Sequence, residues 1–414
     1  MDNQFSNNTK IIIIITYFLL VIITEFFYRK PLQELSITFI LFLQKKITNN
    51  KIIEIFLIII TNFGSEKVLI PIVLIFLFFN PLIYSYYLIF SLMTSTYIAS
   101  LLKLIYSNYR PYWDNNNEIL PIVNCDMGYG NPSGHTLVST VTYLGLWKLL
   151  QKNRIKKRKW TSLTILFCMI LMILSIIFTR IIGGVHNLNQ ILFGFLLGLG
   201  MYLIYYHLYK FYNKQPEMFF IFIEENKKIL NIIFITLYII SLPIYFMVND
   251  KENKEKFDET ITTKCGNDKI PPFHKQYSYE GFKGTSLMIG LIGILNGILY
   301  SKNKMEIKYP GKEYIIMEWH NLTFKNKIIR FFYIAIYTLP GLIFFLIPSC
   351  FPIVIIMLFK YTISFLLLGF LCFGPGMYYS FIKTFKDEEK NIENISKVVD
   401  YIEGEVNNSF STDD

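Results

Sequence analysis

The sequence predicts an all-α protein, a polytopic membrane helical bundle of roughly nine to ten transmembrane helices. Of its 414 residues, 53% are hydrophobic, whereas soluble domains average about 45–50%. Apolar runs of about 18 residues recur along the chain, and each is long enough to cross a hydrocarbon core of roughly 30 Å. Charged residues are nearly absent inside these runs, which argues against the buried helices of a large soluble core.

Taken in order, the apolar runs predict ten spans. They cover 11–28, 68–80, 83–105, 136–150, 162–178, 187–206, 229–248, 283–300, 331–348 and 353–380. The first run lacks the small-residue cleavage site of a signal peptide, so we expect a retained anchor. The segment 36–61 is apolar but contains Gln44 and three lysines, which favours a helix lying in the membrane interface. The side on which the N-terminus lies stays open.

The loops alternate in charge. Loop 151–161 holds six basic residues and no acid, and loop 301–330 holds seven basic and three acidic residues. Loop 106–134 has one base against three acids, and loop 249–282 has six against seven. Because basic loops face the cytosol in multi-pass proteins, loops 151–161, 207–228 and 301–330 and the tail after 381 are expected there. Loops 106–134, 179–186, 249–282 and 349–352 should face the lumen or the outside. The net charge of +10 therefore does not indicate nucleic acid.

The five cysteines show no CxxC pair and no metal-ligand spacing. Cys168 and Cys372 fall inside predicted spans and are expected to pack as apolar residues. Cys125, Cys265 and Cys350 fall on the predicted non-cytosolic side, where a disulfide can persist. One pair among these three and three free thiols both fit the sequence.

The first polar cluster that carries chemistry ends the span 83–105. Lys103 and Arg110 lie seven residues apart, about two helical turns, so both can point into one pocket. A lysine alone at this place is more often one that snorkels to the interface.

The second cluster, Asn131-Pro-Ser133-Gly134-His135, opens the span 136–150. Gly134 lets the backbone approach a ligand closely, and free N–H groups at a helix start favour an anion. Ser133 adds a hydroxyl donor. A simple helix cap would explain Ser133 but leaves His135 unexplained, because a histidine gains nothing from the helix dipole there.

The third cluster joins two spans. Arg180 and His186 bracket a short loop with a Gly-Gly pair, and Gln190 follows His186 by four residues. On a helix His186 and Gln190 share a face, so the Gln190 oxygen can accept from the imidazole and set its tautomer.

Together the clusters predict phosphoryl transfer. This chemistry needs positioning and stabilisation of negative charge on the phosphoryl oxygens, which three cations and helix-start N–H groups supply. Two histidines supply a nucleophile and a general acid. No cluster of Asp and Glu is available to hold Mg²⁺, so no metal and no cofactor is expected.

The three blocks resemble the type 2 phosphatidic-acid phosphatase superfamily, whose pattern is K-x6-RP, PSGH and SR-x5-H-x3-D. All three occur here in order over 103–190 with every spacing kept. The resemblance implies a hydrolase of phosphoric monoesters, with His186 as nucleophile and His135 as acid. It implies phosphate binding by Lys103, Arg110, Ser133, Gly134 and Arg180. Two positions depart from the pattern: Thr179 replaces Ser, and Gln190 replaces the Asp that orients the nucleophile, which leaves a catalytically weak relative open.

Further residues resemble the glucose-6-phosphatase branch. Gln190, the run Arg110-Pro-Tyr-Trp113 and the C-x-x-G-x-G-x-PSGH pattern over 125–135 match it. Asp114, the missing dilysine signal and the extra anchor depart from it, and Phe63-Gly64-Ser65-Glu66 looks like generic lipid-phosphatase relatives. A sugar phosphate such as glucose 6-phosphate is therefore favoured as substrate. Phosphatidic acid, sphingosine 1-phosphate and polyprenyl diphosphates stay as alternatives, and a non-catalytic scaffold or transporter is the minor one.

The expected organisation has four parts. They are an N-terminal anchor and interfacial helix (1–67), a phosphatase core of about six helices (68–210), C-terminal transmembrane helices (211–385) and a polar acidic tail (386–414). The expected partners are a phosphorylated small molecule or lipid and the bilayer, with no nucleic acid, and the oligomeric state stays open. The layout resembles an endoplasmic-reticulum protein whose active site faces the lumen.

Overall fold

The computed structural model describes residues 2–47, 50–79, 82–114, 118–123, 125–153, 159–212, 216–248, 250–266, 276–308, 324–346 and 356–384. Its longer helices are α1 (Asp2–Ile47), α2 (Lys51–Asn62), α3 (Glu66–Phe79), α4 (Leu82–Tyr106), α5 (Gly134–Asn153), α6 (Lys159–Ile182), α7 (Leu188–Tyr212), α8 (Pro216–Met247), α9 (Asp250–Cys265), α10 (Gln276–Thr285), α11 (Leu287–Lys308), α13 (Phe324–Leu342) and α15 (Ser364–Leu371). Short 3₁₀ helices cover Pro111–Trp113 and Ile343–Leu346, and π-helical turns cover Ile356–Ile363 and Cys372–Gly376.

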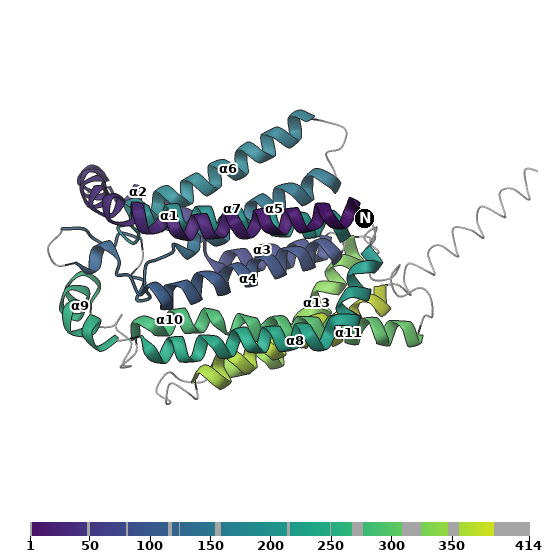
Figure 1. Ribbon diagram of the computed structural model, residues 1–414. Helices are drawn as coiled ribbons and strands as arrows, with labels where there is room; N and C mark the ends of the chain where they lie inside the picture. The colour runs from purple at the N-terminus through teal and green to yellow at the C-terminus, as the bar shows by residue number, and fades with distance from the viewer. Residues whose placement is uncertain are drawn as a thin grey trace, which may run out of the picture.

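The described residues form a helical bundle whose long helices run roughly side by side (Figure 1). Seven of these helices are long and apolar enough to cross a membrane, or eight if α2 and α3, bent by 51°, form one broken span. The predicted all-α membrane fold is thus supported, whereas the count of nine to ten is not confirmed. The predicted spans 136–150 and 331–348 coincide with α5 and α13, which are helical but not among the seven.

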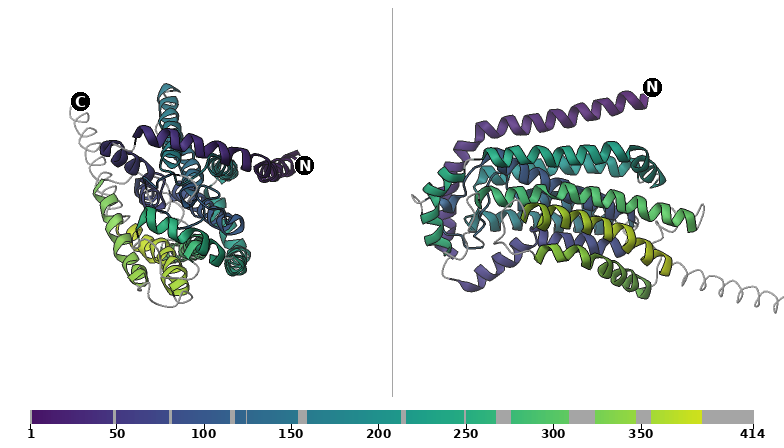
Figure 2. Two further views of the ribbon diagram at one scale, coloured as in Figure 1. Left: turned by 90° about the vertical axis from the view of Figure 1, so that its left-hand side faces the viewer. Right: turned by 90° about the horizontal axis from the view of Figure 1, so that it is seen from below.

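Helix α1 joins two segments that the sequence analysis treats separately. It continues through the predicted anchor 11–28 into the segment 36–61, and its direction changes near the end of the bundle (Figure 2, right). Pro31 lies inside the helix, and a proline removes a helical hydrogen bond and bends the axis. The second part of α1 consequently crosses the end of the bundle.

The core of the bundle brings α7 close to α5. Gly194 and Gly198 lie four apart on α7, and a β-carbon on Gly194 would stand 2.6 Å from the Ser133 carbonyl oxygen. A β-carbon on Gly198 would stand 2.9 Å from the Leu137 carbonyl oxygen. Small residues at this spacing allow helix backbones to approach closely inside a membrane. The start of α5 is thereby held directly against α7.

Close packing at a glycine also occurs between the C-terminal helices. A β-carbon on Gly293 of α11 would stand 2.2 Å from the Leu366 carbonyl oxygen of α15, so this contact requires glycine. Some predicted features lie outside the described residues: Cys350, residues 154–158 of the basic loop 151–161, residues 309–323 of the loop 301–330, and the tail 386–414.

Candidate active site

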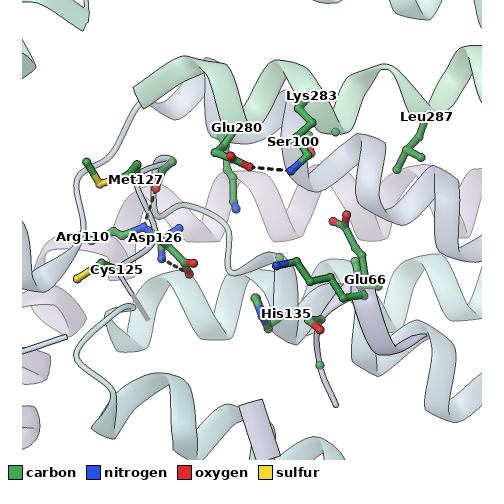
Figure 3. A pocket seen from close by; sticks show the side chains of 18 of the residues that line it. Glu66, Ser100, Arg110, Cys125, Asp126, Met127, His135, Glu280, Lys283 and Leu287 are labelled. Atoms are coloured by element: carbon green, nitrogen blue, oxygen red, sulfur yellow. Dashed lines mark hydrogen bonds and ion pairs between the residues drawn. The ribbon is translucent and has the colours of Figure 1, made fainter. Parts of the chain in front are cut away.

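The three polar clusters of the sequence lie at one end of the bundle. The first follows the end of α4, the second starts α5, and the third lies between α6 and α7. Backbone hydrogen bonds join them: Ser133 N–H donates to the Gln190 carbonyl (3.0 Å), and Gly130 N–H donates to the Asn108 carbonyl (2.8 Å). A cavity of about 430 Å³ opens beside them. In Figure 3, Arg110 and Asp126 lie toward one end of it, Glu66 and Leu287 toward the other, and His135 between.

Arg110 is almost completely buried and lines one end of this cavity. Its Nε donates to the Gly128 carbonyl (2.6 Å), and Nη1 donates to the Val185 carbonyl (3.1 Å). The same Nη1 lies 3.3 Å from Asp126 Oδ2 and 3.4 Å from His186 Nε2. The guanidinium is therefore fixed between the two loops and directed at the imidazole.

Arg180 has no exposed surface. Its Nη2 donates to Asp126 Oδ2 at 2.6 Å. Its Nε and Nη1 are buried and have no hydrogen-bond partner among the described residues. A buried guanidinium with unsatisfied donors is costly, and an anion with several oxygen atoms would satisfy them.

The tautomer of His186 follows from the contacts of Gln190. Gln190 Oε1 accepts from the Asn187 N–H (3.3 Å), and Nε2 donates to the Tyr109 carbonyl (3.0 Å). These two bonds orient the amide, so the atom 3.0 Å from His186 Nδ1 is the oxygen. Since an amide oxygen only accepts, Nδ1 carries the proton. His186 Nε2 is then the unprotonated nitrogen, and its lone pair faces Arg110 Nη1 at 3.4 Å.

The start of α5 adds donors beside the cavity: Gly134 and His135 line it, and the preceding Ser133 is fully buried next to them. Ser133 Oγ accepts from Thr136 Oγ1 (3.0 Å), which leaves the Ser133 hydroxyl proton free to donate. Gly134 lines the cavity at the helix start, where N–H groups lack helical partners. Lys103 Nζ lies 3.6 Å from the place that a β-carbon on Gly134 would take. A side chain at position 134 would therefore crowd the ammonium group.

His135 also lines the cavity (Figure 3). Its ring makes no hydrogen bond to the part of the chain that the structure describes. The eight site residues predicted from the sequence thus all lie at one end of the bundle. Four of them line the cavity: Lys103, Arg110, Gly134 and His135. Arg180 is linked to the cavity through its ion pair with Asp126.

The electrostatics of the site follow from burial among cations. Burial lowers the pKa of His186 well below its ordinary value, and the neighbouring Arg110 and Arg180 lower it further, whereas the hydrogen bond that His186 donates to Gln190 raises it. Burial and Arg180 likewise lower the pKa of His135, while Asp126 opposes this effect. Burial raises the pKa of Asp126, but the two arginines outweigh it and hold that carboxyl ionised well below its usual range.

Asp126 is the residue at this site to which sequence reasoning assigned no role. Asp126 belongs to the C-x-x-G-x-G run. The feature of the sequence that could have indicated its role is a carboxylate in a loop on the same predicted side of the membrane as the three cations. Its neighbour Cys125 is bonded to Cys265 at the end of α9, which resolves the alternatives left open for these two cysteines. The Tyr112 hydroxyl donates to the Asp126 carbonyl (2.6 Å), so the backbone of this loop is held on both sides.

Helix α1 also supports the site, which the sequence did not reveal. Glu25 is fully buried, is paired with Arg29, and accepts from Asn131 Nδ2 (3.0 Å) beside the second cluster. Gln44 donates to the Leu120 and Ile182 carbonyls (2.8 and 2.7 Å). An ionisable residue inside an apolar span indicates a functional role by default. Glu25 is therefore the feature of the sequence from which this role of α1 could have been predicted.

Two further contacts hold the third cluster. Thr179, the replacement for Ser in the motif, makes a hydroxyl–hydroxyl contact of 2.8 Å with Thr61 at the end of α2. Leu188 N–H at the start of α7 donates to Ser36 Oγ (2.7 Å) on α1. Among the described residues, no group of three or more His, Cys, Asp and Glu side chains is placed to hold a metal ion.

The walls of the cavity differ in chemistry. Besides the residues of the three clusters, they carry Glu66, Ser100, Glu280 and Lys283 together with the apolar Val138, Leu287 and Phe365. Lys283 Nζ lies 3.4 Å from Glu280 Oε2. The cavity thus combines a cationic end with a wall that is partly polar and partly apolar.

Comparison with known proteins gives one match. Residues 84–214 match the family model of the PAP2 superfamily, and this segment contains all three clusters. The match supports the superfamily that the motifs indicate and, at the coarse level, phosphatase activity, because members of that superfamily are phosphatases. No curated protein and no solved structure matches the chain significantly.

Proposed function

With the PAP2 superfamily match as premise, we propose that this protein is a membrane-embedded, metal-independent phosphatase that hydrolyses a phosphomonoester through a phosphohistidine. The observation that carries the proposal is the arrangement of His186: its unprotonated Nε2 faces Arg110, and its Nδ1–H is held by Gln190. A nucleophile held by an orienting partner beside unsatisfied cationic donors suits phosphoryl transfer.

In the first step, His186 Nε2 attacks phosphorus and the bond from phosphorus to the leaving oxygen breaks. His135 donates a proton to that oxygen, so the alcohol leaves neutral. Arg110, Arg180 and Lys103 hold the phosphoryl oxygens, together with the Ser133 hydroxyl and the N–H groups at the Gly134 helix start. The negative phosphate raises the lowered pKa of His135 and so helps it to carry the proton.

In the second step, His135 takes a proton from a water molecule that attacks the phosphohistidine. The bond between phosphorus and Nε2 breaks, inorganic phosphate forms and His186 regains its free lone pair. Gln190 keeps the imidazole oriented in both steps but carries no charge to stabilise an imidazolium. This difference from an Asp predicts a slower chemical step than an Asp at the same place would give.

A sugar phosphate such as glucose 6-phosphate is the favoured substrate. Glu66, Glu280 and Ser100 on the wall of the cavity are acceptors or donors suited to hydroxyl groups. Ligand pockets of small molecules span about 300–1,000 Å³, and a cavity of about 430 Å³ lies at the small end of this range. Both features favour a compact polar leaving group.

A lipid phosphate or polyprenyl diphosphate is the second candidate. Val138, Leu287 and Phe365 are apolar residues that line the same cavity, and apolar side chains can receive the start of an acyl or isoprenoid chain. This candidate and the sugar phosphate share all the phosphate-binding residues and differ only in the contacts of the leaving group.

We place the site on the luminal face of the endoplasmic reticulum. The Cys125–Cys265 bond lies at the end of the bundle that carries the site, and disulfides persist on the non-cytosolic side of membranes. The charge of the loops favours the same orientation.

Phosphate release by the purified full-length protein tests the proposal. The substrates are glucose 6-phosphate, phosphatidic acid, sphingosine 1-phosphate and a polyprenyl diphosphate, each with EDTA and each beside His186→Ala. Release from the sugar phosphate alone supports the favoured substrate, and release from a lipid moves the protein to the second candidate. No release from any substrate favours a scaffold or transporter. Full activity of His186→Ala refutes the assignment of His186 as the nucleophile.

A further inference from the structure

Asp126 occupies the place where a phosphate would be expected. Its Oδ2 lies 2.6 Å from Arg180 Nη2 and 3.3 Å from Arg110 Nη1, so one carboxylate oxygen bridges the two guanidinium groups. Figure 3 shows the carboxylate beside Arg110 at the cavity end. No other described acidic residue forms an ion pair with either arginine.

The carboxylate satisfies the arginines only in part. It takes one of the Arg180 donors and leaves Nε and Nη1 buried without a partner. Arginine presents five N–H donors in a planar fork that matches phosphate and carboxylate groups. A tetrahedral phosphate offers more oxygen atoms than Asp126 does and carries up to two negative charges.

The loop allows the carboxylate to leave without unfolding. The Asp126 backbone is held by the hydrogen bond from Tyr112 and by the adjacent Cys125–Cys265 bond. Its side chain, by contrast, is 31% exposed and borders the cavity. A rotation of the side chain toward the cavity is therefore enough to vacate the site.

We propose that Asp126 is an internal ligand of the phosphate site, which pairs with Arg110 and Arg180 in the free protein and is exchanged for phosphoryl oxygens when substrate binds. This inference rests on the proposed function for the identity of the ligand. The exchange keeps the two arginines in place between turnovers and makes every phosphate compete with a resident carboxylate. Ligands with a single negative charge then gain less than a phosphoryl dianion, so the residue also selects for dianions.

The test measures binding of inorganic phosphate and of orthovanadate to the full-length protein by titration calorimetry, with no turnover needed. Asp126→Asn keeps the shape of the side chain and removes its charge. Loss of a charge-assisted competitor should tighten binding of both anions by about 10- to 100-fold. Glu118→Gln, an exposed acidic residue of the same loop, is the matched control and should bind as the wild type does. Asp126→Ala provides a second neutral variant should the Asn variant fail to fold.

A purely structural role predicts the opposite sign. If Asp126 only supported the arginines, the neutral variants would bind phosphate more weakly or equally, and either result overturns the inference. Asp126→Glu retains the charge and should stay closer to the wild-type affinity than to that of Asp126→Asn. The inference and the proposed function fail separately. Tighter binding without phosphate release from any substrate would support the internal ligand and refute the phosphatase, whereas release without tighter binding would do the reverse.

Discussion

Replacing Gln190 with alanine tests how the site prepares its nucleophile. Gln190→Ala removes the acceptor of His186 Nδ1–H and of Asn187 N–H, and also the donor to the Tyr109 carbonyl. All of these groups are buried or nearly so. The other tautomer of His186 then becomes accessible, in which Nε2 carries the proton and cannot attack phosphorus.

The size of the effect follows from the lost hydrogen bond. A buried donor left without its acceptor costs about 1–3 kcal/mol, and each 1.36 kcal/mol is about a tenfold change in rate. We therefore expect kcat to fall roughly 5- to 150-fold. KM should change little, because Gln190 contacts none of the phosphate-binding cations.

Steady-state kinetics on the best substrate of the panel measures both constants. Asn189→Ala is the matched control, since Asn189 is the buried neighbour whose side-chain oxygen has no partner in the described chain. A thermal melt of each variant excludes loss of folding. If Gln190→Ala kept kcat within about twofold of wild type, the tautomer argument would be wrong. Gln190→Glu keeps the acceptor and adds a charge, which raises the pKa of His186 and moves the acid limb of the pH profile to higher pH.

Three further predictions concern pH, α1 and the disulfide. The reaction needs a neutral His186 and a protonated His135, and both residues have lowered pKa values. As pH increases, kcat/KM should therefore rise through the pKa of His186, fall through the pKa of His135 and peak below about pH 6.5. A maximum above neutral pH would contradict this. Glu25→Ala leaves the Asn131 amide short of an acceptor and should lower both thermal stability, by about 1–3 kcal/mol, and kcat, whereas an unchanged melt would show that α1 does not hold this loop. Cys125→Ser should cost about 2–4 kcal/mol of stability, measured as an earlier melt that a reducing agent reproduces in the wild type and does not shift further in the variant.

The amino-acid pattern alone is enough to predict the class of the fold and to identify the motif residues. Apolar runs reveal membrane helices because a bilayer core demands one length and one polarity from every span. Helix geometry predicted that Lys103 and Arg110, and His186 and Gln190, lie close together, but neither pair shares a helix: Arg110 lies beyond the end of α4 at Tyr106, and His186 precedes the start of α7 at Leu188. The loops after α4 and before α7 therefore bring these side chains together. The PAP2 match over 84–214 supports the superfamily read from these motifs, while the branch and the substrate stay proposals.

The residues that complete the site from distant parts of the sequence are revealed by the packing of the helices and loops. Three contacts join residues that are far apart in the sequence. Asp126 and Arg180 are separated by 54 positions, Glu25 and Asn131 by 106, and the bonded Cys125 and Cys265 by 140. No periodicity encodes such contacts, because they depend on how helices pack and where the loops are held. Local chemistry thus identified the cations and histidines, and packing brought a carboxylate to the place where phosphate is expected.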